Sequence, residues 1–139
     1  MKKVTVELNE REVAKIKRIL NENEVIVVDH IDQINYNEYI GKTVKVTGDV
    51  VLIGLGLTKI PINFTEVGGY FNCSYNKFTS LVGAPKVVIG DFYCFRNELT
   101  TLEGSPERVV GNFDCSYNPL KSFEGKPEFI GDEFISSLM

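Results

Sequence analysis

The sequence predicts an α+β protein that is mostly β, in the form of a parallel β-solenoid preceded by a small N-terminal α/β cap. Three observations predict this class. One apolar pattern recurs at a period of 21 residues, glycine and proline recur in phase with it, and a helical pattern precedes the repeats. A period of this length is typical of a chain that coils into stacked turns. The 139 residues suit one such domain.

Each clear repeat contains the segment Phe-x-Cys-x-x-Asn, followed by two further apolar positions. The three copies place these residues at Phe71, Cys73 and Asn76, at Phe92, Cys94 and Asn97, and at Phe113, Cys115 and Asn118. A more divergent copy begins at Gly48, as expected for a terminal repeat that meets a cap on one side. We therefore expect a solenoid over residues 48–135, with four turns and a short C-terminal strand. The turns are expected at residues 48–68, 69–89, 90–110 and 111–131.

The repeat resembles the leucine-rich repeat, whose core reads L-x-L-x-x-N-x-L-x-x-L. The first clear copy fills these columns with Phe71, Cys73, Asn76, Phe78 and Leu81. The short period is similar to that of the bacterial short-repeat branch, and chains of this kind also occur in tailed phages. The resemblance implies a concave sheet that binds another protein. In a phage setting it implies an inhibitor or modulator of a host defence protein.

The alternation in Phe71-x-Cys73 predicts that both named side chains point into the solenoid. Because stacked parallel strands lie about 4.8 Å apart, the phenylalanines of successive turns should form an aromatic ladder. Asn76 and Asn97 lie where the chain leaves the strand, so backbone groups of adjacent turns are the expected partners of their amides. Since the middle turn has neighbours on both sides, Asn97→Leu is expected to destabilise more than Asn76→Leu.

The residues between the inward positions should face outward on the concave sheet, and they vary most between copies. The candidate partner-binding residues are Tyr70, Asn72, Tyr75, Asp91, Tyr93, Phe95, Arg96, Asp114 and Tyr117. Tyrosine and arginine are enriched at binding hot spots, and aspartates around them supply a polar rim. The alternative is that the rings only cover neighbouring turns. We expect a non-catalytic module that binds another protein through this face.

Residues 1–47 are expected to form a strand-helix-strand cap. Residues 3–8 alternate like a strand, and residues 25–28 are the second strand. Asn9 followed by Glu12 resembles a capping box at the start of a helix that runs to about residue 20. The apolar face of this helix is expected to cover the first solenoid turn.

The same helix carries Lys15, Lys17 and Arg18, which form either a solvated outer face or a basic contact for an acidic partner or nucleic acid. The alternative function is therefore a nucleic-acid-directed or nucleic-acid-mimicking protein that uses this helix or the acidic strand face. The net charge of −4 argues against broad phosphate binding, so another protein is the expected partner.

The composition argues against a membrane span, a metal site and a cofactor. No apolar run reaches about 18 residues, and no secretory signal is visible at the start. The three cysteines all fall on inward positions of the repeat, and an odd number is typical of a reducing compartment. The sequence therefore predicts a cytoplasmic protein without metal or cofactor.

Two further features concern catalysis and assembly. His30 is the one histidine and has no nucleophile pattern beside it, and Gly41-Lys42-Thr43 lacks the first glycine of a phosphate loop, so no enzyme is expected. At the C-terminal edge, Asp132 and Glu133 discourage the addition of a further strand. The open alternative is a homodimer that pairs through this edge.

Overall fold

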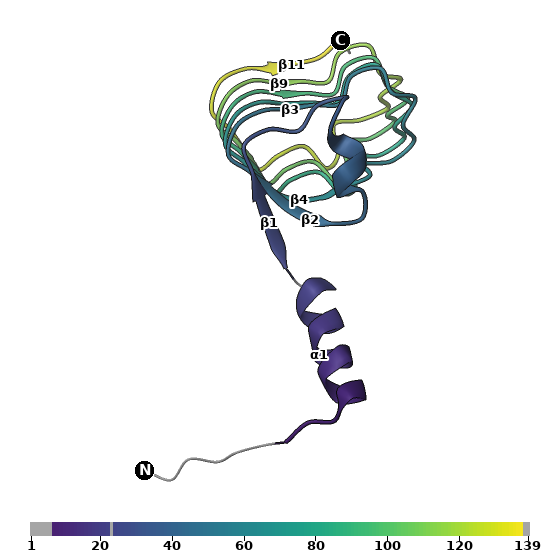
Figure 1. Ribbon diagram of the computed structural model, residues 1–139. Helices are drawn as coiled ribbons and strands as arrows, with labels where there is room; N and C mark the ends of the chain where they lie inside the picture. Colours follow the sequence, from purple (N-terminus) through teal and green to yellow (C-terminus); the bar gives the residue numbers. More distant parts are fainter. Residues whose placement is uncertain (1–6, 23, 138–139) are drawn as a thin grey trace.

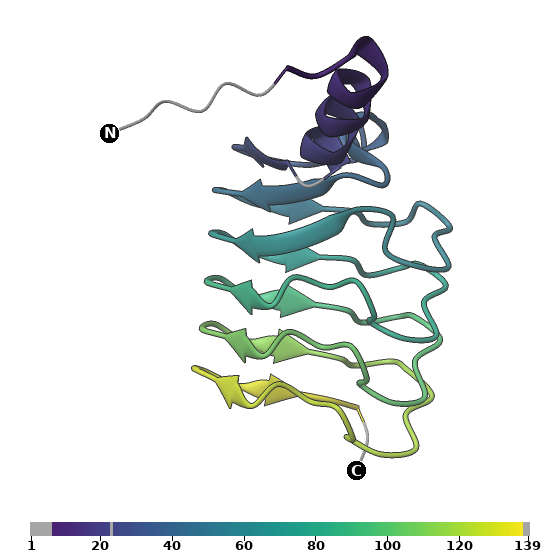
Figure 2. The same cartoon turned by 90° about the horizontal axis from the view of Figure 1, so that it is seen from below.

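The computed structural model describes residues 7–22 and 24–137 as a parallel β-solenoid with one helix at its N-terminal end (Figure 1). Figure 2 shows the turns stacked in a nearly straight column, so the expected concave sheet is better described as a flat face. Two parallel sheets account for the strands of the described residues, one with six strands and one with five.

The two sheets form different sides of each turn. The long sheet contains β1 (Val25–Val28), β2 (Thr43–Val46), β4 (Asn63–Val67), β6 (Val87–Val88), β8 (Arg108–Val109) and β10 (Phe129–Ile130). The repeat sheet contains β3 (Val50–Val51), β5 (Phe71–Asn72), β7 (Phe92–Tyr93), β9 (Phe113–Asp114) and β11 (Phe134–Ile135). All pairings are parallel and follow the order of the chain, as expected when each lap lies on the previous one.

The period predicted from the sequence is confirmed by the register. Phe71 pairs with Phe92, and Phe92 pairs with Phe113. The stack also extends further toward the N-terminus than residue 48, because β1 pairs with β2 and the buried Ile31 bridges to Val50. Residues 25–47 thus form an additional turn, although they lack the Phe and Asn that mark the later copies.

The predicted ladder fills the interior of the stack. The rings of Phe71, Phe92 and Phe113 lie parallel, with centroids 5.2 Å apart at each step and planes within 4°. Phe134 continues the ladder at 5.7 Å from Phe113. All except Phe134 are fully buried, and each should stabilise the fold by about 1.5–3 kcal/mol.

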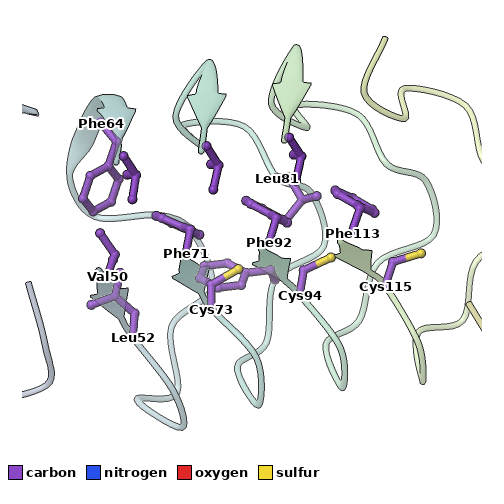
Figure 3. Close-up of a cluster of buried hydrophobic side chains, with 14 of the residues drawn as sticks. Val50, Leu52, Phe64, Phe71, Cys73, Leu81, Phe92, Cys94, Phe113 and Cys115 are labelled. Atoms are coloured by element: carbon purple, nitrogen blue, oxygen red, sulfur yellow. The ribbon is translucent and has the colours of Figure 1, made fainter. Parts of the chain in front are cut away.

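The cysteines form a second file beside the ladder (Figure 3). Each thiol donates to a backbone carbonyl of the following turn, for example from Cys73 to Tyr93 at 3.5 Å and from Cys94 to Asp114 at 3.5 Å. The prediction that these residues act as small inward side chains is therefore confirmed.

The asparagines are hydrogen-bonded to the backbone, as expected. The side-chain oxygen of Asn97 accepts from the Phe78 N–H at 3.1 Å, and its amide donates to the Cys73 and Cys94 carbonyls, both at 3.1 Å. Asn76 has the corresponding partners one turn earlier. Both side chains bond to their own turn and the preceding turn, and neither bonds to the following one. The two asparagines are therefore equivalent, and the neighbour on the far side of the middle turn gives no reason for Asn97→Leu to destabilise more than Asn76→Leu.

The helix differs from the sequence expectation in its position. α1 (Glu10–Glu22) begins with the predicted capping box, in which the Asn9 side chain accepts from the Glu12 N–H at 2.8 Å. However, Ile16 and Ile19 are each 43% exposed, and Figure 1 shows the helix projecting away from the stack. The expectation that its apolar face covers the first turn is wrong. The expected strand over residues 3–8 lies largely outside the described residues.

A different segment packs on the core near the N-terminal end of the stack. The short 3₁₀ helix η1 (Tyr36–Tyr39) brings two half-buried tyrosine rings against the buried cluster. At the other end, β10 and β11 are the last strands of the two sheets, and Asp132 and Glu133 lie exposed in the connection between them. Pairing through this edge stays a prediction.

Candidate functional site

The outward side of the repeat sheet, with the turn that follows each strand, carries a continuous set of aromatic side chains around one arginine. We call this set the aromatic face; it consists of Tyr70, Tyr75, Tyr93, Phe95, Arg96 and Tyr117. Ring centroids lie 6.5 Å apart for Tyr70–Tyr93, 6.2 Å for Tyr93–Phe95 and 5.5 Å for Tyr75–Phe95. Each pair is edge-to-face, the geometry that aromatic rings favour. The structure therefore joins six of the predicted site residues into one patch.

Arg96 lies between two tyrosines from the neighbouring turns. Its guanidinium carbon is 4.3 Å from the ring centroid of Tyr117 and 5.7 Å from that of Tyr75. Both distances allow a cation–π interaction, and the Tyr117 contact is the closer one. In the described part of the chain, no ion pair joins this guanidinium to a carboxylate.

The same three residues have an unusual backbone. Tyr75, Arg96 and Tyr117 have φ values of 60°, 54° and 58°, in the left-handed region. Gly54 occupies the equivalent position of the first copy, with φ of 65°. This conformation costs an L-residue about 1–2 kcal/mol, whereas glycine adopts it freely. Sequence reasoning did not identify the strain, and the glycine at position 54 was the signal that could have revealed it.

These strained positions point their side chains to solvent. Tyr75 is 52% exposed and Tyr117 is 61% exposed, and Arg96 is also exposed. Burial therefore does not explain why three successive turns carry large side chains where glycine fits best.

The predicted aspartate Asp91 is engaged within the solenoid. One of its carboxylate oxygens accepts from the Asn112 N–H at 2.7 Å, and the other accepts from the Tyr93 hydroxyl at 2.9 Å. The first bond passes over Gly111, where a Cβ atom would collide with the carboxylate. The hydrogen bond to Asp91 is also the main cause that raises the pKa of Tyr93. Asp91 therefore fixes the Tyr93 ring on the aromatic face.

The other two predicted polar residues also bond to the backbone. Asp114 accepts from the Ser116 N–H at 3.0 Å, and Asn72 accepts from the Ser74 N–H at 3.1 Å. Both side chains thus hold the backbone at the end of a strand. In the described structure the guanidinium of Arg96 makes no such bond and lies against tyrosine rings instead.

Ser74 differs from the other residues of this side, because it is fully buried and its hydroxyl has no hydrogen-bond partner in the described structure. The register places it between Ile53 of the preceding turn and Phe95 of the following one. A buried hydroxyl without a partner is unfavourable and calls for an explanation. Strand alternation after the inward Cys73 predicts that Ser74 faces outward, and nothing in the sequence indicated its burial.

The three cysteines and His30 are the remaining candidates from the sequence for catalysis or metal binding. Burial raises the pKa of all three thiols, that of Cys115 to about 11, so they stay protonated at neutral pH.

His30 lies between two carboxylates. Its Nδ1 is 3.3 Å from the Asp29 carboxylate and its Nε2 is 3.5 Å from the Asp32 carboxylate. The bond to His30 is the main cause that lowers the pKa of Asp29, and the Asn35 N–H is the main cause for Asp32. Within residues 7–22 and 24–137, no group of acidic, His and Cys side chains is placed to hold a metal.

A basic cleft lies between α1 and the corner that contains Gly41. It has a volume of about 700 Å³, and its lining includes the cations Lys17, Arg18 and Lys42 together with Glu24. Two of the three basic helix residues named from the sequence thus line the same cleft as Lys42, while Lys15 lines a neighbouring hollow that shares Arg18 with it.

Comparison of the chain with protein-family models, with curated proteins and with solved structures found no match. The fold is therefore described by its architecture alone, a parallel β-solenoid. No helix in the described ranges is long and apolar enough to cross a bilayer.

Proposed function

We propose that the protein is a non-catalytic binding module that holds a partner protein against the aromatic face. One observation carries this proposal: Tyr75, Arg96 and Tyr117 keep exposed side chains on backbone where glycine would be free of strain. Backbone strain of this kind is often found at functional sites, where the surrounding structure holds it in place. At Tyr117 the cation–π contact with Arg96 would recover only part of the strain, since such a contact contributes about 0.5–1 kcal/mol at an exposed site.

The composition of the face supports the same proposal. Tyrosine and arginine supply most hot spots of protein interfaces, and repeat solenoids offer extended surfaces for binding. We also propose that the repeats are of the leucine-rich type, on the strength of the Asn column and its backbone bonds. Inhibition of a host defence protein in a phage setting stays a prediction of that resemblance.

The double variant Tyr93→Ala/Phe95→Ala tests the proposal by partner capture from a lysate of cells that produce the protein. It removes the rings that connect the two halves of the face. The matched control is Arg108→Ala/Phe129→Ala on the long sheet, where a guanidinium also lies 4.3 Å from a ring that is 40% exposed. We expect the face variant to lose the captured protein and the control to retain it. Equal capture by the two variants would contradict the proposal.

The second candidate function is anion binding at the basic cleft, favoured by the convergence of Lys17, Arg18 and Lys42. Its natural ligand class is a nucleic acid backbone, whose affinity falls steeply with salt. The test is binding of a single-stranded oligonucleotide at two salt concentrations, with Lys17→Glu/Arg18→Glu as the variant. Loss of binding in that variant, with retention in Tyr93→Ala/Phe95→Ala, would favour this candidate over the first.

A further inference from the structure

We infer that Arg96 anchors the partner by pairing with a carboxylate, so that the segment held on the aromatic face is acidic and also carries apolar side chains. The inference rests on the proposed function and names the chemistry of the group that this face recognises. It follows from the position of the guanidinium, from the engagement of the neighbouring carboxylates and from the net charge of the chain.

The guanidinium is already oriented before any partner binds. Tyr117 lies on one side at 4.3 Å and Tyr75 lies in the other neighbouring turn at 5.7 Å. The planar guanidinium offers N–H donors in a fork that matches the two oxygens of a carboxylate. Because its orientation is held by the stack, less side-chain entropy is lost when such a pair forms.

The aspartates of the face, Asp91 and Asp114, are engaged with other groups. Asp91 accepts from Asn112 and Tyr93, and Asp114 accepts from a backbone N–H. No ion pair to Arg96 is present in the described residues. The carboxylates of the face accept hydrogen bonds within the solenoid, so we expect a carboxylate that pairs with Arg96 to come from another molecule.

The surroundings of Arg96 favour an acidic protein segment over a polyanion. The net charge of −4 opposes the approach of a long run of phosphates, whereas one carboxylate among apolar groups can dock locally. Phe95 precedes Arg96 in the chain and its ring contacts those of Tyr75 and Tyr93, so the face around the arginine offers apolar contact. Rings that exclude water around a charged pair strengthen it, as in the centre of protein interfaces.

The test is selection of a random peptide library, displayed on yeast, against the full chain. We expect the enriched peptides to share Asp or Glu beside an aromatic or aliphatic residue. Arg96→Gln should weaken these peptides on the order of 30-fold, the loss that marks a hot spot. Arg96→Lys should recover part of the binding, because it restores the charge without the planar fork. Arg108→Gln on the long sheet is the control and should bind like the unmodified chain.

The outcomes separate this inference from the proposed function. One outcome is that the enriched peptides fail to bind Tyr93→Ala/Phe95→Ala but show no acidic preference and bind Arg96→Gln as well as the unmodified chain. This outcome would overturn the pairing of Arg96 with a carboxylate and would leave the aromatic face as the binding surface. If every enriched peptide binds both variants as well as it binds the unmodified chain, the inference and the proposed function are both overturned. If a urea titration shows that Arg96→Gln is not folded in the absence of urea, Arg96→Asn is used in its place, because asparagine tolerates the left-handed backbone.

Discussion

Replacing Arg96 with asparagine should separate the stability of the solenoid from its binding. The backbone at this position has φ of 54°, which costs an arginine about 1–2 kcal/mol and costs asparagine less. The substitution also removes the contacts with Tyr117 and Tyr75, of which the closer one contributes about 0.5–1 kcal/mol at an exposed site. The two effects have opposite signs. We therefore expect the free energy of unfolding to change by less than about 1 kcal/mol.

A core substitution on the same turn gives the scale for comparison. Phe92 is fully buried and stacks at 5.2 Å on rings of both neighbouring turns, so Phe92→Ala should cost about 3–5 kcal/mol. The same balance of strain and contact applies to Tyr117→Asn, which should also be close to neutral, whereas Tyr75→Asn also loses the edge-to-face contact with Phe95 and should cost more.

The assay is urea denaturation of the Arg96→Asn, Phe92→Ala and unmodified chains, followed by partner capture with the folded variants. We expect Arg96→Asn to unfold near the unmodified chain and to lose the partner. A loss of stability above about 2 kcal/mol would refute the reasoning, because the Tyr–Arg–Tyr stack would then serve the fold and its strain would need no functional explanation.

Three further predictions concern the interior of the turns. Asn97→Leu and Asn76→Leu should each cost about 2–4 kcal/mol in urea denaturation, because both leave backbone groups of two turns without partners; a difference above about 1 kcal/mol would contradict their equivalence. Ser74→Ala should raise the unfolding free energy by about 1 kcal/mol, since it removes a buried hydroxyl without a partner; a loss of stability would mean that the hydroxyl is bonded. Stability should fall as pH rises from the ordinary thiol pKa of 9.0 toward about 11, because the unfolded Cys115 loses its proton first. Cys115→Ala should reduce this fall by about 1.4 kcal/mol per pH unit, and an unchanged slope would argue against a raised pKa.

The sequence was most informative where a column repeats. The inward direction of Phe71 and Cys73, the stacking of the rings and the backbone partners of Asn97 were all predicted, because each is dictated by the same local pattern in every turn. The gathering of the exposed tyrosines around Arg96 followed from the same register.

The features that escaped prediction depend on contacts that a repeat pattern does not encode. The left-handed backbone at Tyr75 was hidden because tyrosine normally avoids it, and only Gly54 marked the position. The first turn was missed because it lacks the Phe and Asn of the later copies and because the step from Ile31 to Val50 is 19 residues, not 21. An amphipathic pattern in α1 indicates an apolar face but not what that face contacts, so the expected cover of the first turn was wrong.

Hydroxyl-radical footprinting of the protein with and without its captured partner tests the central claim most directly. It compares Tyr75 and Tyr117 on the aromatic face with Phe129 on the long sheet, all of which are exposed in the free protein. We predict that the partner protects both tyrosines and leaves Phe129 as reactive as before. Protection of Phe129 with no change at the tyrosines would contradict the claim that the aromatic face is the binding surface.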